Sequence, residues 1–486
     1  MPQSLACLAA VLKRAGIEVR VIDCAPVKMG WNSLRSLLKK ENPDVVGIGD
    51  SESLYSHEAM RVLKTAKEVN PKVITIAGGA HFSNLIQESL SSSPIDFIVK
   101  GEGEYTLLEL IKELEKPKPD FMKVRGIAFK QDNKIIETPP RPLIEDLDKL
   151  PIPAYELMPM REYGKSRFLF SPGGATIHHS RGCIDRCKFC VWWVQMAERK
   201  LENGEVKPHP KWRTKSVGRT IEEIRLLYHK YNKRFLVFVD DSWNISQSWN
   251  EEFAEALIKE NIKIGWFAFM RADFMLRDEK AGILKKLVDS GMSHICIGAE
   301  RESNEELRSI GKNCYSRDMV KECLLILKNK YPQVFRQVTF IVGIRGETRE
   351  SLLRQVNYAQ EICADYPAFH PMTPVPGTEA WREAKEKGWL EIKDFSYYDW
   401  TTPVMSSGTN LSREEIEDLV YLASRKFISF PWIIKGLCSP FRIKRNMYIW
   451  WLLVAVKIFI DSFGRFVLPL NVKEYTKLVK PKWYDS

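Results

Sequence analysis

Three cysteines near the middle of the chain lie close enough in sequence to hold one metal centre. Cys183, Cys187 and Cys190 follow a Cys-x3-Cys-x2-Cys spacing, and Gly182 loosens the turn that precedes them. A zinc site normally takes four protein ligands, and no second Cys or His pair at zinc-finger spacing lies nearby. Three thiolates suit a [4Fe-4S] cluster whose fourth iron stays open for a substrate or cofactor. We therefore expect an iron-sulfur cluster at these cysteines.

The cysteine spacing, with the aromatic Phe189 directly before the last cysteine, resembles the radical S-adenosylmethionine (SAM) superfamily. In that superfamily the open iron binds SAM, and one electron cleaves it to a 5′-deoxyadenosyl radical that abstracts an unactivated hydrogen. The resemblance implies a cluster and SAM as cofactors, with Phe189 beside them. It also implies an external one-electron reductant, of the ferredoxin or flavodoxin type, as a partner.

Strand-like apolar segments follow the cysteine loop and alternate with helical segments. One more apolar segment precedes the loop. The predicted strands are residues 175–179, 234–241, 264–271, 294–300, 337–343 and 368–372. Strands that alternate with helices pair in parallel, and six of them favour an open (β/α)6 barrel. The chemistry of such a barrel belongs at the carboxyl ends of its strands.

Charged side chains stand at three of these strand ends. Asp240 and Asp241 end the second strand, where the superfamily contacts the methionine amino group of SAM. Arg271 ends the third strand, and its guanidinium matches the methionine carboxylate. Glu300 ends the fourth, where a carboxylate can accept two hydrogen bonds from a ribose diol. We expect these four residues to bind SAM.

The first part of the chain also alternates strands with helices. Strands are predicted at residues 18–23, 44–49, 73–77 and 96–99, and helices at 4–15, 31–40 and 57–70. This pattern predicts a doubly wound parallel sheet, which binds ligands beyond the carboxyl ends of its strands. Glycines at those ends let a flat ligand approach the backbone closely. The candidate cofactor-binding residues there are Gly49, Asp50, Gly78, Gly79, Gly101 and Glu102.

This Rossmann-like pattern resembles the cobalamin-binding domain attached to many radical SAM enzymes. The resemblance is carried by residues 5–12, 43–48, 77–81 and 101–107, and it implies cobalamin as a further cofactor. The first strand of such a domain, and the Asp-x-His-x-x-Gly motif that follows it, are missing from the sequence. We expect His57 and His81 to be surface or core histidines and not cobalt ligands.

Most of the chain is similar to the anaerobic magnesium-protoporphyrin IX monomethyl ester cyclase group and its hopanoid-associated relatives. Residues 211–216, 238–241 and 394–405 carry this similarity, and residues 190–194 and 240–243 depart from it. It implies an enzyme that performs cobalamin-dependent methyl transfer or oxidative cyclisation at an unactivated C–H position. The substrate would be hydrophobic, such as a tetrapyrrole or an isoprenoid lipid. Radical SAM chemistry without cobalamin and a non-catalytic sensor are the alternatives.

Composition sets the remaining expectations. The 486 residues are 44% hydrophobic and 28% charged, as in ordinary globular proteins. Ten cysteines without pairing rhythm indicate a reducing cytoplasm. The net charge of +11 is carried mostly by scattered lysines, which indicates a solvated surface and no nucleic-acid partner. We expect a cobalamin-binding domain at 1–116, a hairpin and Pro-rich linker at 117–165, a barrel at 166–385 and a helical region at 386–486.

Two apolar features have open interpretations. Residues 447–456 are too short for a membrane span, and basic residues flank them. They fit either an interfacial helix on an anionic membrane, placing the protein peripherally at the inner face, or a helix packed on the barrel. Five tryptophans could wall a site for a flat substrate or pack the core. They are Trp192, Trp193, Trp212, Trp243 and Trp266.

Overall fold

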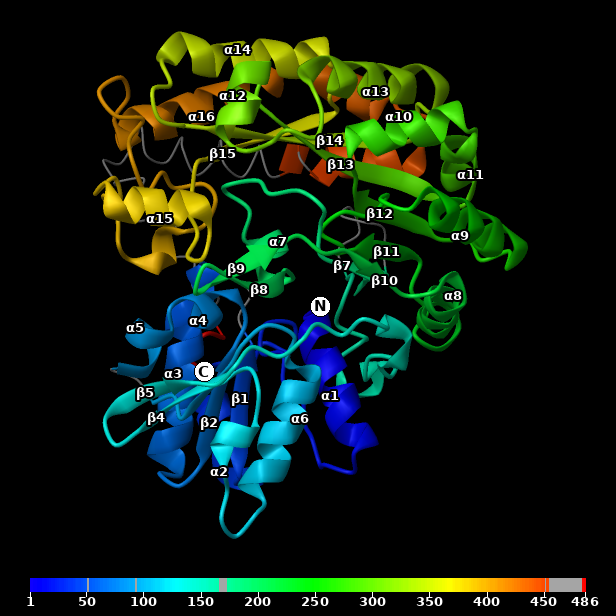
Figure 1. Ribbon diagram of the computed structural model, residues 1–486. Coiled ribbons are helices and arrows are strands. Elements are labelled where there is room, and N and C mark those ends of the chain that lie inside the picture. Colours follow the sequence, from blue (N-terminus) through cyan, green and yellow to red (C-terminus); the bar gives the residue numbers. More distant parts are fainter. Residues whose placement is uncertain (50–51, 92–93, 166–172, 451, 454–482) are drawn as a thin grey trace.

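Two α/β units, one above the other, make up the molecule (Figure 1). The computed structural model describes residues 1–49, 52–91, 94–165, 173–450, 452–453 and 483–486. The lower unit contains a five-stranded sheet and the upper unit a six-stranded sheet, with a helical C-terminal region beside the upper one. The predicted fold class is confirmed.

The lower sheet has the order β1-β2-β3-β4-β5. Its parallel strands are β1 (Val45–Gly49), β2 (Ile74–Gly78) and β3 (Phe97–Val99), followed by the antiparallel pair β4 (Ile127–Gln131) and β5 (Lys134–Glu137). Asp132 and Asn133 both have positive φ, as a two-residue hairpin turn requires. The sequence assigns this hairpin to the linker, whereas in the structure β4 pairs with β3 and extends the sheet.

Helices cover this sheet. They are α1 (Gln3–Arg14), α2 (Trp31–Glu41), α3 (Ser56–Val69), α4 (Ala80–Asn84), α5 (Ile86–Ser91) and α6 (Gly103–Leu114). The predicted strand at residues 18–23 is wrong, because this stretch forms no ladder. Val19 and Val21 pack instead against Ala9 and Ala10 of α1. The alternating pattern arises because only one side of this stretch is buried. An extended segment that packs on a helix buries alternate side chains, as a strand in a sheet does.

The upper sheet is parallel throughout, with the order β15-β14-β13-β12-β11-β6. Its strands are β6 (Gly174–Ile177), β11 (Phe235–Phe238), β12 (Gly265–Phe269), β13 (Met292–Glu300), β14 (Phe335–Val342) and β15 (Tyr366–Pro371). All six predicted strands are confirmed. Since β6 and β15 are the two ends of the order, the barrel is open, as expected for six strands.

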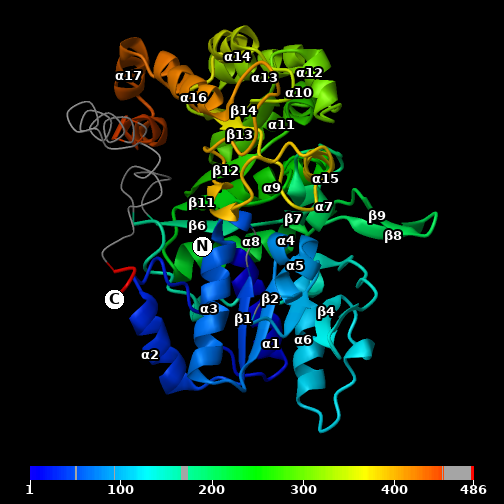
Figure 2. The same ribbon diagram turned by 90° about the vertical axis from the view of Figure 1, so that its left-hand side faces the viewer.

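The helices that follow these strands lie outside the sheet (Figure 1). They are α8 (Val217–Arg225), α9 (Gln247–Lys259), α10 (Ala272–Lys280), α11 (Ile283–Asp289), α12 (Asn304–Ser309), α13 (Arg317–Lys330), α14 (Arg349–Glu361) and α15 (Glu379–Glu386). A hairpin of β8 (Glu198–Glu202) and β9 (Glu205–His209) projects from the body of the molecule (Figure 2).

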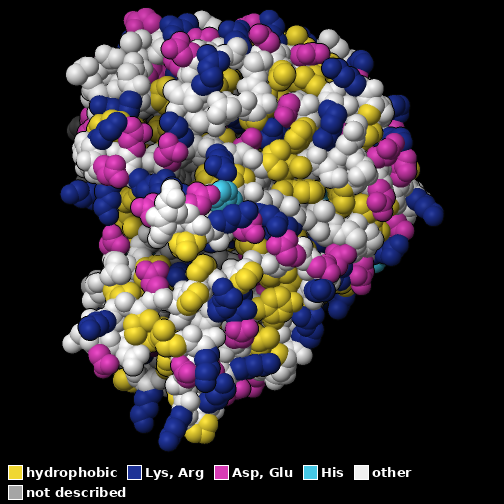
Figure 3. All heavy atoms as spheres, viewed as in Figure 1, with side chains coloured by type: hydrophobic (Ala, Val, Ile, Leu, Met, Phe, Trp, Pro, Cys, Tyr) yellow, Lys and Arg dark blue, Asp and Glu magenta, His cyan; other side chains and the backbone are white. Residues whose placement is uncertain are grey.

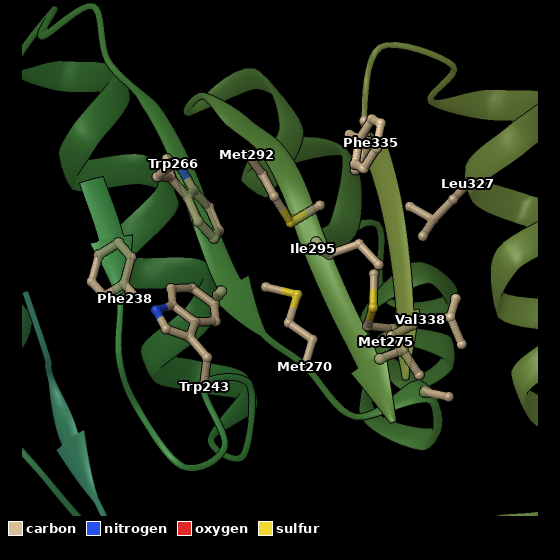
Figure 4. Packing of buried hydrophobic residues seen from close by; sticks show 14 of the residues in the cluster. Phe238, Trp243, Trp266, Met270, Met275, Met292, Ile295, Leu327, Phe335 and Val338 are labelled. Carbon is tan, nitrogen blue, oxygen red and sulfur yellow. The ribbon is translucent and has the colours of Figure 1, made fainter. Parts of the chain in front are cut away.

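The largest core lies between the barrel strands and these helices (Figure 4). Trp243 and Trp266 stack there with ring centroids 4.9 Å apart, and neither is exposed to solvent. These two tryptophans therefore pack the core and do not wall a substrate site. Removing either ring would leave a cavity and cost about 3–5 kcal/mol.

The C-terminal region adds α16 (Arg413–Phe427), α17 (Phe430–Leu437) and a helical stretch at 442–450. Met447 and Tyr448 are 1% exposed, so the alternative of a helix packed on the barrel holds for this described part of the 447–456 run. Residues 451 and 454–456 lie outside the described part. No helix in the described ranges is both long and apolar enough to cross a membrane. Figure 3 shows basic and acidic side chains interspersed on one face.

Candidate cofactor site between the two domains

A short antiparallel ribbon forms the base of the cysteine loop. It pairs β7 (Ser180–Arg181) with β10 (Arg213–Thr214). The Asp240 Oδ1 atom accepts hydrogen bonds from the Ser180 amide (2.6 Å), the Ser180 hydroxyl (2.6 Å) and the His179 amide (3.1 Å). The Asp241 carboxylate accepts one from the Gly182 amide (2.8 Å). The two carboxylates after β11 thus hold the entry to the loop.

Burial changes the acidity of both carboxylates. It raises the pKa of Asp240 to about 7 and that of Asp241 to about 6, against the opposing effect of the hydrogen bonds they accept. The Asp240 Oδ2 atom is buried and has no hydrogen-bond partner within the described part of the chain. One oxygen of Asp240 is therefore not used by the fold, and the contact predicted with the SAM amino group stays a prediction.

The cysteine loop itself is held by close backbone packing. Gly182 has a φ of +86°, and a Cβ there would lie 1.9 Å from the Lys211 carbonyl oxygen, so only glycine fits. The Lys188 amide donates to the Ile310 carbonyl (3.0 Å). Phe189 packs on Ile310 in an apolar cluster with residues that follow β14 and β15. The loop is anchored on the barrel at both ends.

Arg271 and Glu300 already have partners at the strand ends. Arg271 binds Asp273 through two bonds (3.1 and 2.7 Å) and also pairs with Asp185 in the cysteine loop. Glu300 has a φ of +61° and accepts a hydrogen bond from Lys312 (3.1 Å). In this structure both residues support the loop region, and their contacts with SAM stay predictions.

Lys312 is a site residue that the sequence analysis missed. Its ammonium lies 5.0 Å from the centre of the Tyr315 ring and pairs with Glu300. Burial alone would lower the pKa of Lys312, but Tyr315, Glu300 and the Cys187 thiol outweigh it and raise the pKa above its usual value. No motif marks this position, because Lys312 reaches the cysteine loop only through the fold.

Glycines line the carboxyl edge of the lower sheet. Gly78 ends β2 and pairs in register with Val99 of β3, and a Cβ on Gly78 would lie 3.4 Å from the Val99 carbonyl. Gly79 and Gly101 have φ values of +98° and +70°, and a Cβ on Gly101 would meet nothing within 4 Å. Gly49 ends β1 at the same edge. Asp50 lies outside the described residues.

The two histidines near this edge lie in different surroundings, one in the core and one at the surface. His81 is buried, hydrogen-bonded to the Ser53 hydroxyl (2.9 Å) and in edge-on contact with Phe82 and Phe395. Burial lowers its pKa to about 4. His57 is largely exposed and pairs with Asp394 (3.1 Å).

An apolar cluster joins the edges of the two sheets. Ala80, which follows Gly79, packs with Val191 of helix α7 (Val191–Gln195) and with Val375. Trp192 and Trp400 are partly buried against them. Since α7 begins directly after Cys190, the glycine edge of the lower sheet and the cysteine loop share one apolar wall.

Comparison with known proteins decides the family. Residues 1–111 match the model of the B12 binding domain, and residues 177–359 match that of the radical SAM superfamily. An uncharacterized methyltransferase of Pyrococcus horikoshii is 30% identical over 433 residues, which cover 88% of this chain and 87% of the relative. The chain belongs to the radical SAM proteins with a cobalamin-binding domain. It is an enzyme, of the group that contains methyltransferases and cyclases.

Further relatives of this cobalamin-binding radical SAM enzyme agree. The anaerobic magnesium-protoporphyrin IX monomethyl ester cyclase of Rubrivivax gelatinosus is 28% identical, covering 88% of this chain and 73% of the cyclase. The solved structure of the radical SAM methyltransferase TsrM from Kitasatospora setae has a TM-score of 0.63 at 17% identity, covering 79% of this chain and 75% of TsrM. The structural likeness shows a shared fold. The predicted family resemblance is confirmed.

The cofactors of the family are a [4Fe-4S] cluster, SAM and cobalamin, and the residues present fit each of them. Cys183, Cys187 and Cys190 are free thiols on one loop. Burial raises the pKa of Cys187 and Cys190 to about 12. Among the described residues no three His, Cys, Asp or Glu side chains converge as around a single ion. A cubane cluster does not require this, because each cysteine binds a different iron.

The unused Asp240 oxygen suits a SAM molecule at the open iron, since an amino group would satisfy it. The open space at Gly101 and the glycine-lined strand ends suit a flat cofactor such as cobalamin. Glu102 does not line this space. Both of its carboxylate oxygens are bound by Arg181 and Arg213 of the β7–β10 ribbon.

Proposed function

We propose that this enzyme transfers a methyl group to an unactivated carbon of an apolar substrate. When bound, the cluster and SAM supply radical chemistry and cobalamin carries a methyl group. The observation that supports the proposal is the partly exposed indole surface of Trp192 and Trp400 beside the buried apolar cluster of Ala80, Val191 and Val375. It lies where the cysteine loop and the glycine edge meet. A second candidate is oxidative cyclisation of a tetrapyrrole, favoured by the cyclase relative.

The chain's own residues hold, orient and shield the reactants in this proposal. The three cysteines hold the cluster. Asp240 and Asp241 fix the ribbon from which the cysteine loop begins. Lys312 and Arg271 place two positive charges near the cysteines. Positive charge near thiolates favours their ionised form, which is the form that binds iron.

The wall residues act by excluding water and by holding a flat or greasy substrate. Trp400 is fixed by a hydrogen bond between its carbonyl and the His370 ring (3.0 Å). The neighbouring Trp193 donates from Nε1 to the Cys187 carbonyl (2.9 Å), which ties α7 to the cluster loop. A rigid indole next to the cofactors gives a large contact area at low entropic cost. We propose an external one-electron donor as the protein partner.

The test uses the reconstituted holoenzyme, an external reductant and SAM with a deuterated methyl group. A tetrapyrrole ester, an isoprenoid lipid and a set of polar metabolites are offered in parallel. We expect deuterium in an apolar product, and a several-fold rise of KM in Trp192→Ala with iron and corrinoid contents unchanged. Label in polar compounds only would contradict the proposed substrate class. A cyclised, unlabelled tetrapyrrole would select the second candidate.

A further inference from the structure

Four buried charges from the two domains form a cluster that neither domain completes alone. Glu102 and Glu104 come from the turn after β3 and the start of α6, and Arg181 and Arg213 come from β7 and β10. Arg181 donates to Glu102 (2.7 Å) and to Glu104 (2.5 Å), and Arg213 donates to Glu102 (2.8 Å). Their side chains are between 3% and 9% exposed. We call these four residues the junction cluster.

The register of the ribbon shows why the carboxylates are needed. Arg181 and Arg213 are direct partners in the antiparallel β7–β10 pair. Like charges directly opposite each other on neighbouring strands destabilise the pairing. Glu102 lies between the two arginines and binds both, one with each oxygen. The ribbon therefore depends for its charge balance on a residue of the other domain.

The remaining contacts of Glu102 fix its position. The Ile144 amide donates to the same oxygen that binds Arg213 (2.7 Å), and Arg213 donates to the Ile144 carbonyl (2.7 Å). Burial alone would raise the pKa of Glu102, but Arg181 and Arg213 outweigh it, so the pKa lies below its usual value and the group is ionised at neutral pH.

The junction cluster stands between the two cofactor edges. Arg181 precedes Gly182 and Cys183, the first residues of the cysteine loop. Glu102 lies between Gly101 and Gly103, at the glycine-lined edge beyond β3. The junction cluster therefore links the position of one edge to that of the other through buried charged contacts.

Other ion pairs between the domains are of a different kind. Lys385 of α15 and Glu88 of α5 lie 3.4 Å apart, and their side chains are 60% and 57% exposed. Exposed pairs of this type contribute little and tolerate movement. A buried network is strong only in one geometry, so it specifies position more than it adds stability.

We propose that the junction cluster sets the separation and orientation of the cobalamin-binding edge relative to the cysteine loop. Arg181 and Glu102 are then positioning residues, which touch no reacting atom and act through the two loops that they join. This inference rests on the proposed function, because it concerns transfer between two cofactors that must lie within reach of each other.

The test is a spectroscopic measurement of the distance between the cofactors. The holoprotein is reduced with dithionite so that cob(II)alamin and the [4Fe-4S] cluster are both paramagnetic, and their spin–spin splitting is recorded. Arg181→Lys keeps the charge but replaces the fixed, forked guanidinium by a compact ammonium on a flexible stem, so the two carboxylates are no longer held in one geometry. Glu104→Gln removes one charge with little change of shape. We expect loss or broadening of the splitting in both variants, with iron and corrinoid per chain unchanged.

The matched control is Glu88→Gln, the same substitution in the exposed interdomain pair, which we expect to keep the wild-type splitting. The proposal is overturned if Arg181→Lys and Glu104→Gln keep the wild-type splitting, or if wild type with both cofactors bound has none. Should Arg181→Lys fail to fold, Glu104→Gln alone decides between these outcomes. Failure of the proposed function would be visible separately, as wild type that shows the splitting but transfers no labelled methyl group to an apolar substrate.

Discussion

Two buried carboxylates, Glu102 and Asp365, have similar partners at opposite ends of the barrel strands. Glu102 lies between two arginines at the domain junction. Asp365 lies between Arg336 (2.9 Å) and Lys444 (2.9 Å). Asp365 precedes β15 at the amino end of the barrel strands, whereas Glu102 faces the carboxyl ends. Barrels keep their chemistry at the carboxyl ends and can use the amino ends for stability. The same kind of buried ion pair therefore positions the cofactor edges at the carboxyl ends of the barrel strands and stabilises the fold at their amino ends.

The partners of Asp365 explain its task. The Tyr448 hydroxyl donates to its carboxylate (2.6 Å), and the Trp432 indole donates to its carbonyl (2.7 Å). Both aromatic residues belong to the C-terminal region, as does Lys444. Burial alone would raise the pKa of Asp365, but Arg336 and Lys444 outweigh it and lower the pKa. Asp365 therefore fastens the C-terminal helices to the barrel, far from the cysteine loop in structure.

The largest effect on stability is expected from Asp365→Ala. This change leaves Arg336 and Lys444 buried without their carboxylate, which costs about 3–5 kcal/mol. Urea unfolding of the cofactor-free protein measures it. Iron content and 5′-deoxyadenosine release per folded chain should stay at the wild-type level. Equal stability of variant and wild type would show that Asp365 does not fasten the C-terminal region.

Glu102→Gln should have a smaller effect on stability and a larger one on chemistry. The amide keeps one acceptor for Arg181 or Arg213 but no charge, and we expect a cost of about 1–3 kcal/mol. 5′-Deoxyadenosine should be released in excess over methylated product, because the two cofactor edges no longer hold their separation. Product analysis of the reconstituted enzyme checks the ratio. An unchanged ratio would place Glu102 in the same class as Asp365.

A third buried carboxylate, Asp240, forms no ion pair with an arginine or lysine in the described part of the chain, and its acidity distinguishes it from Glu102 and Asp365. Its pKa is raised from 3.8 to about 7, so the folded protein keeps a proton that the unfolded chain has lost. The free energy of unfolding therefore falls as the pH rises through this interval. Asp240→Asn should flatten that fall, measured by urea unfolding at pH 5 and pH 8 in the cofactor-free protein. Asp241, with a pKa of about 6, retains part of it. Parallel pH profiles of the two proteins would contradict this assignment.

The smallest effect is expected at the exposed pair of Glu88 and Lys385. Glu88→Gln should change the free energy of unfolding by less than about 0.5 kcal/mol, because water screens the pair. The same unfolding measurement checks it. A loss of unfolding free energy as large as that of Glu102→Gln would mean that exposed and buried interdomain ion pairs contribute equally to stability.

Local sequence patterns predicted the elements that carry strong periodicity. The six barrel strands and the cysteine loop were found because buried parallel strands are apolar runs and metal ligands keep their spacing. The stretch 18–23 was misassigned, since one-sided burial of Val19 and Val21 resembles a strand whether or not another strand pairs with it. The pairing of β4 with β3 joins segments far apart in the chain, and no local pattern encodes it.

The site was predicted where ligand chemistry is local and missed where it depends on tertiary contacts. Glu102 was placed at the cofactor because it stands in a glycine turn, but its charge is used by Arg181, 79 residues away. Lys312 could not be found, because its proximity to Cys187 arises from the packing of its loop on the barrel. The pairing of Arg271 could have been predicted from the sequence, because Asp273, two residues further on, provides a carboxylate that Arg271 can bind.

The most direct test is the release of 5′-deoxyadenosine from SAM by the anaerobically purified, reconstituted and reduced protein with cobalamin bound. We predict release by wild type, none by Cys187→Ala, and corrinoid absorbance in both, because the cysteine loop and the glycine-lined edge belong to different domains. The absence of release from wild type, or equal release from Cys187→Ala, would contradict a cluster at Cys183, Cys187 and Cys190.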